Sequence, residues 1–159
     1  MIIRAASVAD ARAICAISNA LIRDTLITFT TAPRAEGATQ DAILDADGAF
    51  LVAEDQGAVV GFASFGPFRS GPGYACCKEH SIQLAEDARG RGTGTALMAR
   101  LEGIARKRGV HVLVAGISSA NPAGIAFHQK QGFVEVGRMP EVGRKWDQWL
   151  DLILMQKIL

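Results

Sequence analysis

A glycine-rich turn is the part of this sequence whose residue types and spacing point most directly to a chemistry. The turn follows an apolar run, residues 81–85, that predicts a strand, and it reads Arg89-Gly90-Arg91-Gly92-Thr93-Gly94-Thr95. Glycines at a helix start let a ligand approach the backbone closely. The free N–H groups and the positive end of the helix dipole favour a phosphate there. The turn is therefore a candidate cradle for a pyrophosphate.

Two common nucleotide-binding motifs do not fit this turn. The chain contains no Gly-x-x-x-x-Gly-Lys-Ser/Thr run, which excludes a Walker-type loop. A dinucleotide site requires a third glycine and an acidic residue about twenty residues later. Position 95 is a threonine, and the next predicted strand, residues 110–117, holds no acidic residue. On this motif alone, a tight strand-to-helix turn without a ligand remains the alternative.

Two side chains outside the turn are candidate acid–base groups. Glu79 falls in the middle of a predicted strand, where half-burial would raise its pKa and let it accept a proton near neutrality. The pKa of His128 makes it a candidate proton donor or relay member. The alternatives are a solvent-facing Glu79 paired with Lys78 or Arg69, and a core histidine bonded to backbone. His80 must face the opposite side of the strand from Glu79, so we predict a structural role for it.

The alternation of predicted strands and helices indicates one mixed α/β (α+β) domain over residues 1–159. A doubly wound nucleotide-binding fold is the competing architecture. The spacing of apolar residues predicts four helices, of which the first is capped by Ser7 and the third follows the glycine turn. The predicted ranges are strands at 2–5, 50–54, 59–65, 74–85, 110–117, 133–138 and 149–156, and helices at 7–22, 39–46, 93–105 and 122–131.

The composition limits the partners that we expect. The formal net charge is +1, with 49% hydrophobic and 21% charged residues, so we expect no long-range attraction to nucleic acid or to acidic membrane surfaces. No apolar run approaches the roughly eighteen residues of a membrane span. No signal-peptide pattern opens the chain. Three cysteines argue against a disulfide framework and for a cytoplasmic, reducing environment. None has zinc-ligand spacing, so no metal is expected, and adjacent Cys76 and Cys77 are predicted to be packing residues.

Taken in order along the chain, these motifs resemble the GNAT superfamily of N-acetyltransferases, in its phosphinothricin acetyltransferase-like branch. The resemblance spans nearly the whole sequence and implies a central mixed, twisted sheet flanked by helices in a homodimer. The residues that carry it are Asn19, Thr25, Thr28-Phe29, Pro67-Phe68-Arg69, Tyr74, Glu79-His80-Ser81, Arg89-x-x-Gly92-x-Gly94, Asn121-Pro122, His128-x-x-x-Gly132-Phe133, Gly143, Trp149 and Asp151.

The resemblance implies acetyl-CoA as co-substrate and assigns roles to these residues. Glu79, five residues after Tyr74, corresponds to the general base of the family. His128 stands where most members of the family have a tyrosine that acts as general acid. A bulge near Leu84 would splay two parallel strands and expose a backbone N–H to the thioester oxygen. The implied cofactor-binding residues are Ile82, Leu84, Arg89, Gly90, Arg91, Gly92, Thr93, Gly94, Thr95 and Asn121.

The acceptor implied by the resemblance is the α-amine of a small amino acid or analogue, such as phosphinothricin or methionine sulfoximine. The family loop Pro-Phe-Arg-x-Arg reads Pro67 to Gly71 here, so its second arginine is missing, and selectivity for an anionic side chain should weaken. A polyamine, an aminoglycoside or a protein N-terminus remain alternative acceptors. A non-catalytic acyl-CoA-binding sensor or interaction module remains an alternative to an enzyme. The implied substrate-binding residues are Phe29, Phe68, Arg69, Tyr74 and Lys78.

Overall fold

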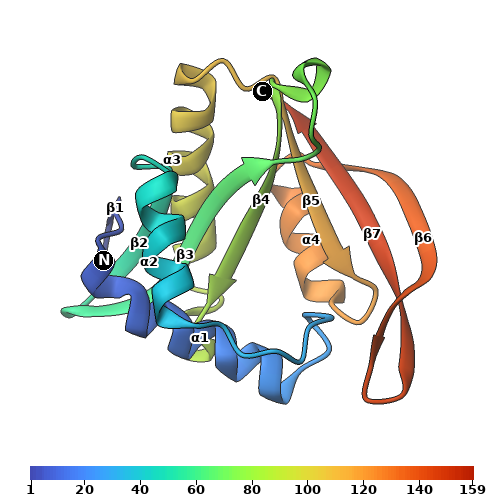
Figure 1. The fold of residues 1–159 in the computed structure, drawn as a ribbon, viewed down its shortest axis with the longest axis horizontal. Coiled ribbons are helices and arrows are strands. Elements are labelled where there is room, and N and C mark those ends of the chain that lie inside the picture. Colours follow the sequence, from blue (N-terminus) through green and yellow to red (C-terminus); the bar gives the residue numbers. More distant parts are fainter.

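The computed structural model describes residues 1–159, which form one seven-stranded sheet and four α-helices (Figure 1). The strand order is β1-β2-β3-β4-β5-β7-β6. The strands are β1 (Ile2–Ala5), β2 (Phe50–Asp55), β3 (Ala58–Pro67), β4 (Cys77–Leu84), β5 (Val112–Ser118), β6 (Val134–Lys145) and β7 (Gln148–Ile158). The helices are α1 (Ala11–Asp24), α2 (Glu36–Asp45), α3 (Thr93–Lys107) and α4 (Pro122–Lys130).

Helices cover both faces of the sheet, because successive residues of each strand point to opposite sides. On β2, Leu51 and Ala53 pack in the larger core with Leu97 and Leu101 of α3. Phe50 of the same strand packs in a second core with residues of α1 and α2. Figure 1 accordingly shows α1 and α2 in front of the sheet and α3 and α4 behind it.

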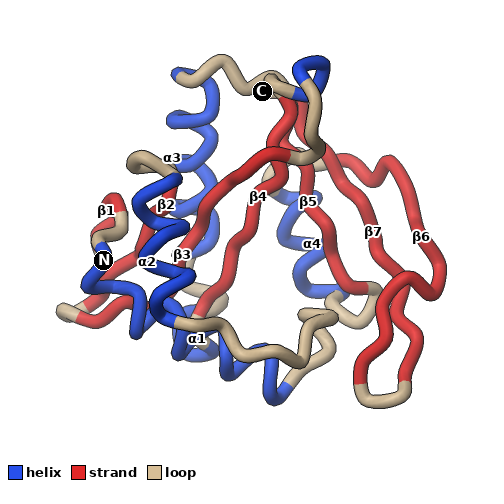
Figure 2. Tube along the Cα trace, in the orientation of Figure 1, coloured by secondary structure: helices blue, strands red, loops and turns tan.

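The two halves of the sheet meet at its only parallel pair, β4 and β5. Three residue pairs join these strands, from Cys77 opposite Val112 to Glu79 opposite Val114. Beyond Glu79 the strands diverge, β4 staying with β3 and β5 with β7 (Figures 1 and 2). A doubly wound sheet is largely parallel, so that competing architecture is wrong. The predicted splay is present, although the β3–β4 register runs to Leu84 without a bulge.

Several predicted boundaries shift for local reasons. β4 begins at Cys77 rather than at residue 74, because residues Pro72–Tyr74 form a turn of 3-10 helix. The helix α2 begins at Glu36, three residues before the predicted start. The last two strands form a longer hairpin than predicted. Its turn places Trp146 and Asp147 at positive φ of 50° and 59°, and tryptophan there is not a recognisable turn signal.

The structure bears on the predicted packing role of the cysteines and on the expectation that no segment spans a membrane. All three cysteines are free, and Cys76 is exposed, so the predicted packing role is wrong for it. Cys76 precedes β4 in a stretch that the prediction had included in the strand. None of the helices is long and apolar enough to cross a membrane.

Candidate active site

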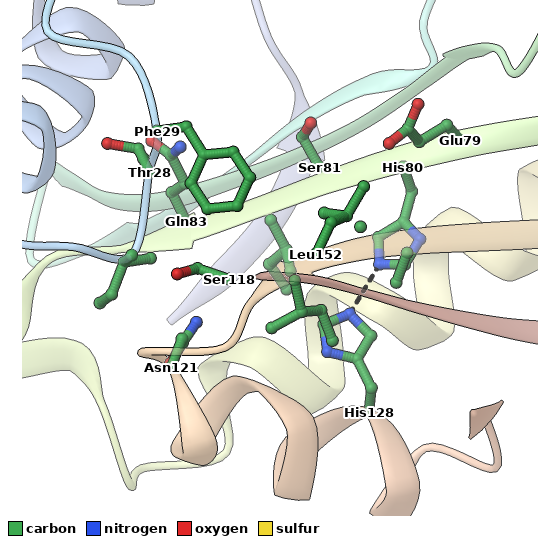
Figure 3. Close-up of a pocket in the computed structure, with 15 residues that line it drawn as sticks. Thr28, Phe29, Glu79, His80, Ser81, Gln83, Ser118, Asn121, His128 and Leu152 are labelled. Carbon is green, nitrogen blue, oxygen red and sulfur yellow. Dashed lines mark hydrogen bonds between the residues drawn. The ribbon is translucent and has the colours of Figure 1, made fainter. Parts of the chain in front are cut away.

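The splay between β4 and β5 opens onto two adjoining cavities (Figure 3 shows the first). One, of about 270 Å³, contains Glu79 and Phe29 in its lining. The other, of about 400 Å³, extends from the splay to the glycine turn. The residues that line both cavities, and so mark their junction, are Ile27, Ile82, Gln83, Asn121 and His128.

The glycine turn leaves the first backbone N–H groups of α3 without partners. Gly90 and Gly92 have φ of 73° and 82°, which L-residues rarely adopt, and Gly92 is the N-cap. No side chain caps this helix, and the N–H groups of Thr93, Gly94 and Thr95 have no acceptor within the chain. Such groups at a helix N-terminus are suited to bind phosphate oxygens.

Most of the predicted cofactor residues line the cavity beside this turn. Arg91 and Thr93 do not line it, and the Thr93 side chain is buried. The N–H of Gly124 donates to the Asn121 side chain at 2.9 Å, so Asn121 is a helix cap that also lies at the junction. The predicted residues that line this cavity are Ile82, Leu84, Arg89, Gly90, Gly92, Gly94, Thr95 and Asn121.

The free edge of β4 presents hydrogen-bonding groups to the opening. The N–H of Ala85 donates to the carbonyl of Val60 at 2.9 Å, which fixes the alternation of the β3–β4 ladder. That alternation turns the backbone groups of Ile82 and Leu84 away from β3 and toward the splay. They are therefore available to an extended ligand that pairs like an added strand.

Glu79 is the last residue of β4 that is paired with β5, and its carboxylate lies over Gly116 of β5. A Cβ added to Gly116 would come 3.1 Å from Glu79 Oε1, so this glycine makes room for the carboxylate. The expectation of half-burial is wrong: Glu79 is exposed, because the neighbouring strand diverges at this point. Neither Lys78 nor Arg69 forms an ion pair with it.

His128 is buried and has both ring nitrogens engaged. Its Nδ1 donates to the Gly124 carbonyl at 2.7 Å, and its Nε2 lies 2.9 Å from Nε2 of His80. Burial lowers the pKa of both imidazoles, and the charge of His128 lowers that of His80 further. His80 does face away from Glu79, but it also lines the cavity and contacts the candidate acid, so a purely structural interpretation is too narrow.

A segment after α1 forms one wall of the smaller cavity and is anchored by a buried lysine. Lys145, 2% exposed, donates from Nζ to the carbonyls of Thr25 and Thr28 at 2.7 and 3.1 Å. No carboxylate accompanies it, and burial lowers its pKa. Ser118 Oγ donates to the Leu26 carbonyl at 2.7 Å. These bonds fix Phe29 at the cavity.

The other predicted substrate residues lie elsewhere. Phe68 and Tyr74 contact one another with ring centroids 6.3 Å apart, and the Arg69 guanidinium lies 5.4 Å from the Phe68 centroid. Lys78 is paired in register with Pro67. Their loop joins the start of β4, at the opposite end from Leu84 (Figure 1), and none of the four lines either cavity. Of the predicted substrate residues, only Phe29 does.

Sequence reasoning missed Gln83 and the contribution of His80. Ser18 Oγ donates to Gln83 Oε1 at 2.7 Å, which fixes the Gln83 amide at the junction. A signal for His80 was present: it is two and four residues before Ile82 and Leu84, so it shares their strand face. No sequence pattern pointed to Ser18, because its partner is 65 residues away.

Comparison with known proteins identifies the family to which this arrangement belongs. Residues 14–133 match the model of the acetyltransferase (GNAT) family. The chain belongs to the GNAT acetyltransferase family. This GNAT chain is 41% identical to an L-methionine sulfoximine/L-methionine sulfone acetyltransferase of Pseudomonas paraeruginosa, over 97% of the chain and 92% of the relative. A match to L-amino acid N-acyltransferase MnaT of Escherichia coli is 48% identical but covers 67% of the chain and 62% of the relative.

Solved structures are similar over the whole GNAT chain. A ribosomal-protein-alanine N-acetyltransferase from Brucella melitensis superposes with a TM-score of 0.94, at 43% identity and 100% coverage of both chains. A phosphinothricin acetyltransferase from Sinorhizobium meliloti, in complex with AcCoA, superposes with a TM-score of 0.93 at 34% identity, covering 99% of this chain and 88% of that one. The predicted family and fold are thereby confirmed.

Proposed function

We propose that this GNAT chain transfers the acetyl group of acetyl-CoA to the α-amine of a small amino acid or amino-acid analogue. The observation that carries the proposal is the junction of two cavities at the splay. One cavity ends at the unpartnered N–H groups of α3, and the other contains the Glu79 carboxylate. A thioester whose pyrophosphate lies at α3 and whose acceptor lies beside Glu79 must react at that junction.

The proposed path of the cofactor runs from the N-terminus of α3 to the free edge of β4. The N–H groups at residues 93–95 bind the pyrophosphate, and Arg89 adds positive charge beside it. The pantetheine arm pairs with the free backbone groups of Ile82 and Leu84, as an added strand would. The N–H of Leu84 then faces the thioester carbonyl and stabilises its developing negative charge. The structure of the Sinorhizobium meliloti relative contains AcCoA, which supports this choice of co-substrate.

The proposed reaction is direct transfer with Glu79 as general base. Glu79 accepts a proton from the acceptor ammonium group, directly or through one water. The neutral amine attacks the thioester carbonyl carbon, a C–N bond forms, and the C–S bond breaks with its electron pair leaving on sulfur. The sulfur takes up one proton, so the products are the amide and coenzyme A as a thiol. Exposure of Glu79 lets its proton pass to solvent afterwards.

The acceptor is proposed from the cavity and the names of relatives. About 270 Å³ suits a small molecule, and no arginine or lysine lines the cavity of a single chain. Gln83, held through its Oε1 by Ser18, presents its amide N–H groups as neutral donors. A zwitterion with an uncharged side chain fits this lining better than an acceptor with an anionic side chain. Methionine sulfoximine, the substrate named for the Pseudomonas paraeruginosa relative, is the model acceptor.

A protein N-terminus is the second candidate acceptor, because the Brucella melitensis neighbour is named a ribosomal-protein-alanine N-acetyltransferase. Release of coenzyme A thiol, measured across a panel of amines, separates the two candidates. We expect the highest kcat/KM with methionine sulfoximine, methionine sulfone or phosphinothricin. A higher kcat/KM with an alanine-initiated peptide, a polyamine or an aminoglycoside would overturn the acceptor.

The proposed assembly is a homodimer formed through the exposed face of β6. This strand is at the edge of the sheet and carries exposed Val134, Val136, Met139 and Val142. Exposed apolar side chains on an edge strand are a candidate contact surface, and a second copy of the chain would cover them. Sedimentation velocity should give a dimer for the wild type and a monomer for Val136→Lys with Val142→Lys. A monomeric wild type would contradict the proposal.

The proposed location is the cytoplasm. The chain keeps three free cysteines, and Cys76 is exposed to solvent, which fits a reducing compartment. Fractionation of the native organism, followed by immunodetection, should place the protein with cytoplasmic markers rather than in secreted or envelope fractions.

A further inference from the structure

His80 of β4 and His128 of α4 face one another beside the cavity junction (Figure 3). Their Nε2 atoms are 2.9 Å apart, which is a hydrogen-bond distance. Each Nδ1 lies against a backbone carbonyl: His80 at 3.0 Å from Val114 O, and His128 at 2.7 Å from Gly124 O. A carbonyl oxygen only accepts hydrogen bonds, so both Nδ1 atoms must carry a hydrogen.

A neutral imidazole carries only one N–H, so a hydrogen on each Nδ1 leaves both Nε2 atoms as acceptors. With both rings neutral, two Nε2 lone pairs would point at each other across 2.9 Å, which is repulsive. One additional proton converts the contact into an N–H···N hydrogen bond. We propose that His80 and His128 share one proton between their Nε2 atoms, which makes the pair a buried monocation at the cavity junction.

The surroundings limit the pair to a single charge. The rings pack against Phe133, with centroids 5.2 Å from each imidazole, and His128 also packs against Phe127. Both histidines are buried. Burial lowers the pKa of each, and the charge of His128 lowers that of His80 further, so the two rings do not both become cations. This low-dielectric site strengthens the effect of the one charge that remains.

Few other charged groups face the pair. Residues 112–118 of β5 are uncharged, and Lys130 of α4 is exposed. Lys157 of β7 lies 6.0 Å from the Phe133 centroid, where it pairs with Glu102 of α3. Glu79 precedes His80 but extends from the other face of β4 (Figure 3). The shared proton is thus held without a carboxylate bonded to either ring.

The role of this charge rests on the proposed function. His128 lines both cavities, so the pair adjoins the position where the thioester must react. When the C–S bond breaks, negative charge develops on sulfur, and a fixed positive charge nearby lowers the energy of that state. The proton stays with the pair, and the thiolate is protonated from water. His80 is accordingly a positioning residue, which acts through His128.

Nuclear magnetic resonance of the wild-type chain tests the shared proton directly. The chain has three histidines, and the third, His111, is exposed. In protein labelled with 15N-histidine at neutral pH, we expect three protonated nitrogens across the pair, with a scalar coupling between the two Nε2 nuclei. The coupling should vanish in His80→Gln and persist in His111→Gln. Two neutral rings at neutral pH would overturn the proposal.

Kinetics of His80→Gln test the role. A glutamine amide can donate to His128 Nε2 but carries no charge, so the fold and the KM for acetyl-CoA should change little. We expect kcat to fall about tenfold or more, and the alkaline limb of the wild-type pH–rate profile to disappear. Wild-type kcat with an unchanged pH profile, in a folded variant, would overturn the role. If the variant does not fold, the wild-type resonances still decide. Coenzyme A binding without transfer to any amine would refute the proposed function separately.

Discussion

The ring of Phe29 lies directly against the backbone of Gly143. A Cβ added at position 143 would come within 2.5 to 2.7 Å of three ring carbons. Gly143 belongs to the outer strand of the C-terminal hairpin, whereas Phe29 belongs to the segment after α1 and lines the acceptor cavity. The hairpin therefore sets the position of one wall of the proposed acceptor site.

The first prediction follows from that contact. Gly143→Ala must displace the Phe29 ring, since a Cβ closer than 3.0 Å cannot be accommodated without movement. We expect the KM for the amino-acid acceptor to rise severalfold, while the KM for acetyl-CoA stays near wild type. Gly137→Ala is the matched control, because it is on the same strand and nothing lies within 4 Å of its added Cβ. Equal acceptor KM values in the two variants would contradict the assignment.

A second prediction concerns the glycine turn. Gly92→Val places a β-branched residue at a φ of 82° and crowds the unpartnered N–H groups of α3, so coenzyme A affinity should be lost. Gly57→Val controls for the backbone strain, since Gly57 has a φ of 81° in the β2–β3 turn. Isothermal titration calorimetry should show binding in the control only. Unchanged affinity in folded Gly92→Val would mean that this turn does not bind the pyrophosphate.

Acid stability gives a third prediction, which tests the fold. Arg4 donates two hydrogen bonds of 2.8 Å to Asp10, and these lower the Asp10 pKa from 3.8 to about 2. Because the folded-state pKa is the lower one, the stabilisation is complete above pH 4 and is lost as pH falls toward 2. Its size is about 2 kcal/mol. Urea unfolding from pH 5 to pH 2 should show this loss in the wild type and a shallower dependence in Asp10→Asn.

The sequence allowed the local features of the site to be predicted, because they depend on neighbouring residues. The glycine turn needs only its own glycines and the helix that follows, and Asn121 caps the helix that begins at Pro122. The environment of Glu79 was mispredicted for the opposite reason. Its exposure depends on where β5 leaves β4, and β5 is held by its long pairing with β7.

The acceptor side was the least predictable part, because distant segments build it. Lys145 reaches the carbonyl of Thr25 across 120 residues, and Ser118 reaches Leu26 across 92. The loop that carries Phe68 and Arg69 was assigned to the acceptor by resemblance. It adjoins the start of β4 near Glu79, but within one chain none of its residues lines the acceptor cavity. Residue types alone do not reveal which of two loops on one sheet adjoins the cavity.

The most direct test of the account is acetyl transfer to L-methionine sulfoximine by the wild type and by Glu79→Gln, measured as thiol release across a range of pH. We predict acetyl-CoA-dependent turnover by the wild type and a loss of about a hundredfold in kcat in the variant. The loss should shrink as pH rises, because more of the amine is then already neutral. Wild-type turnover by a folded Glu79→Gln variant would contradict the account, and so would a wild type that binds acetyl-CoA without acetylating any amine.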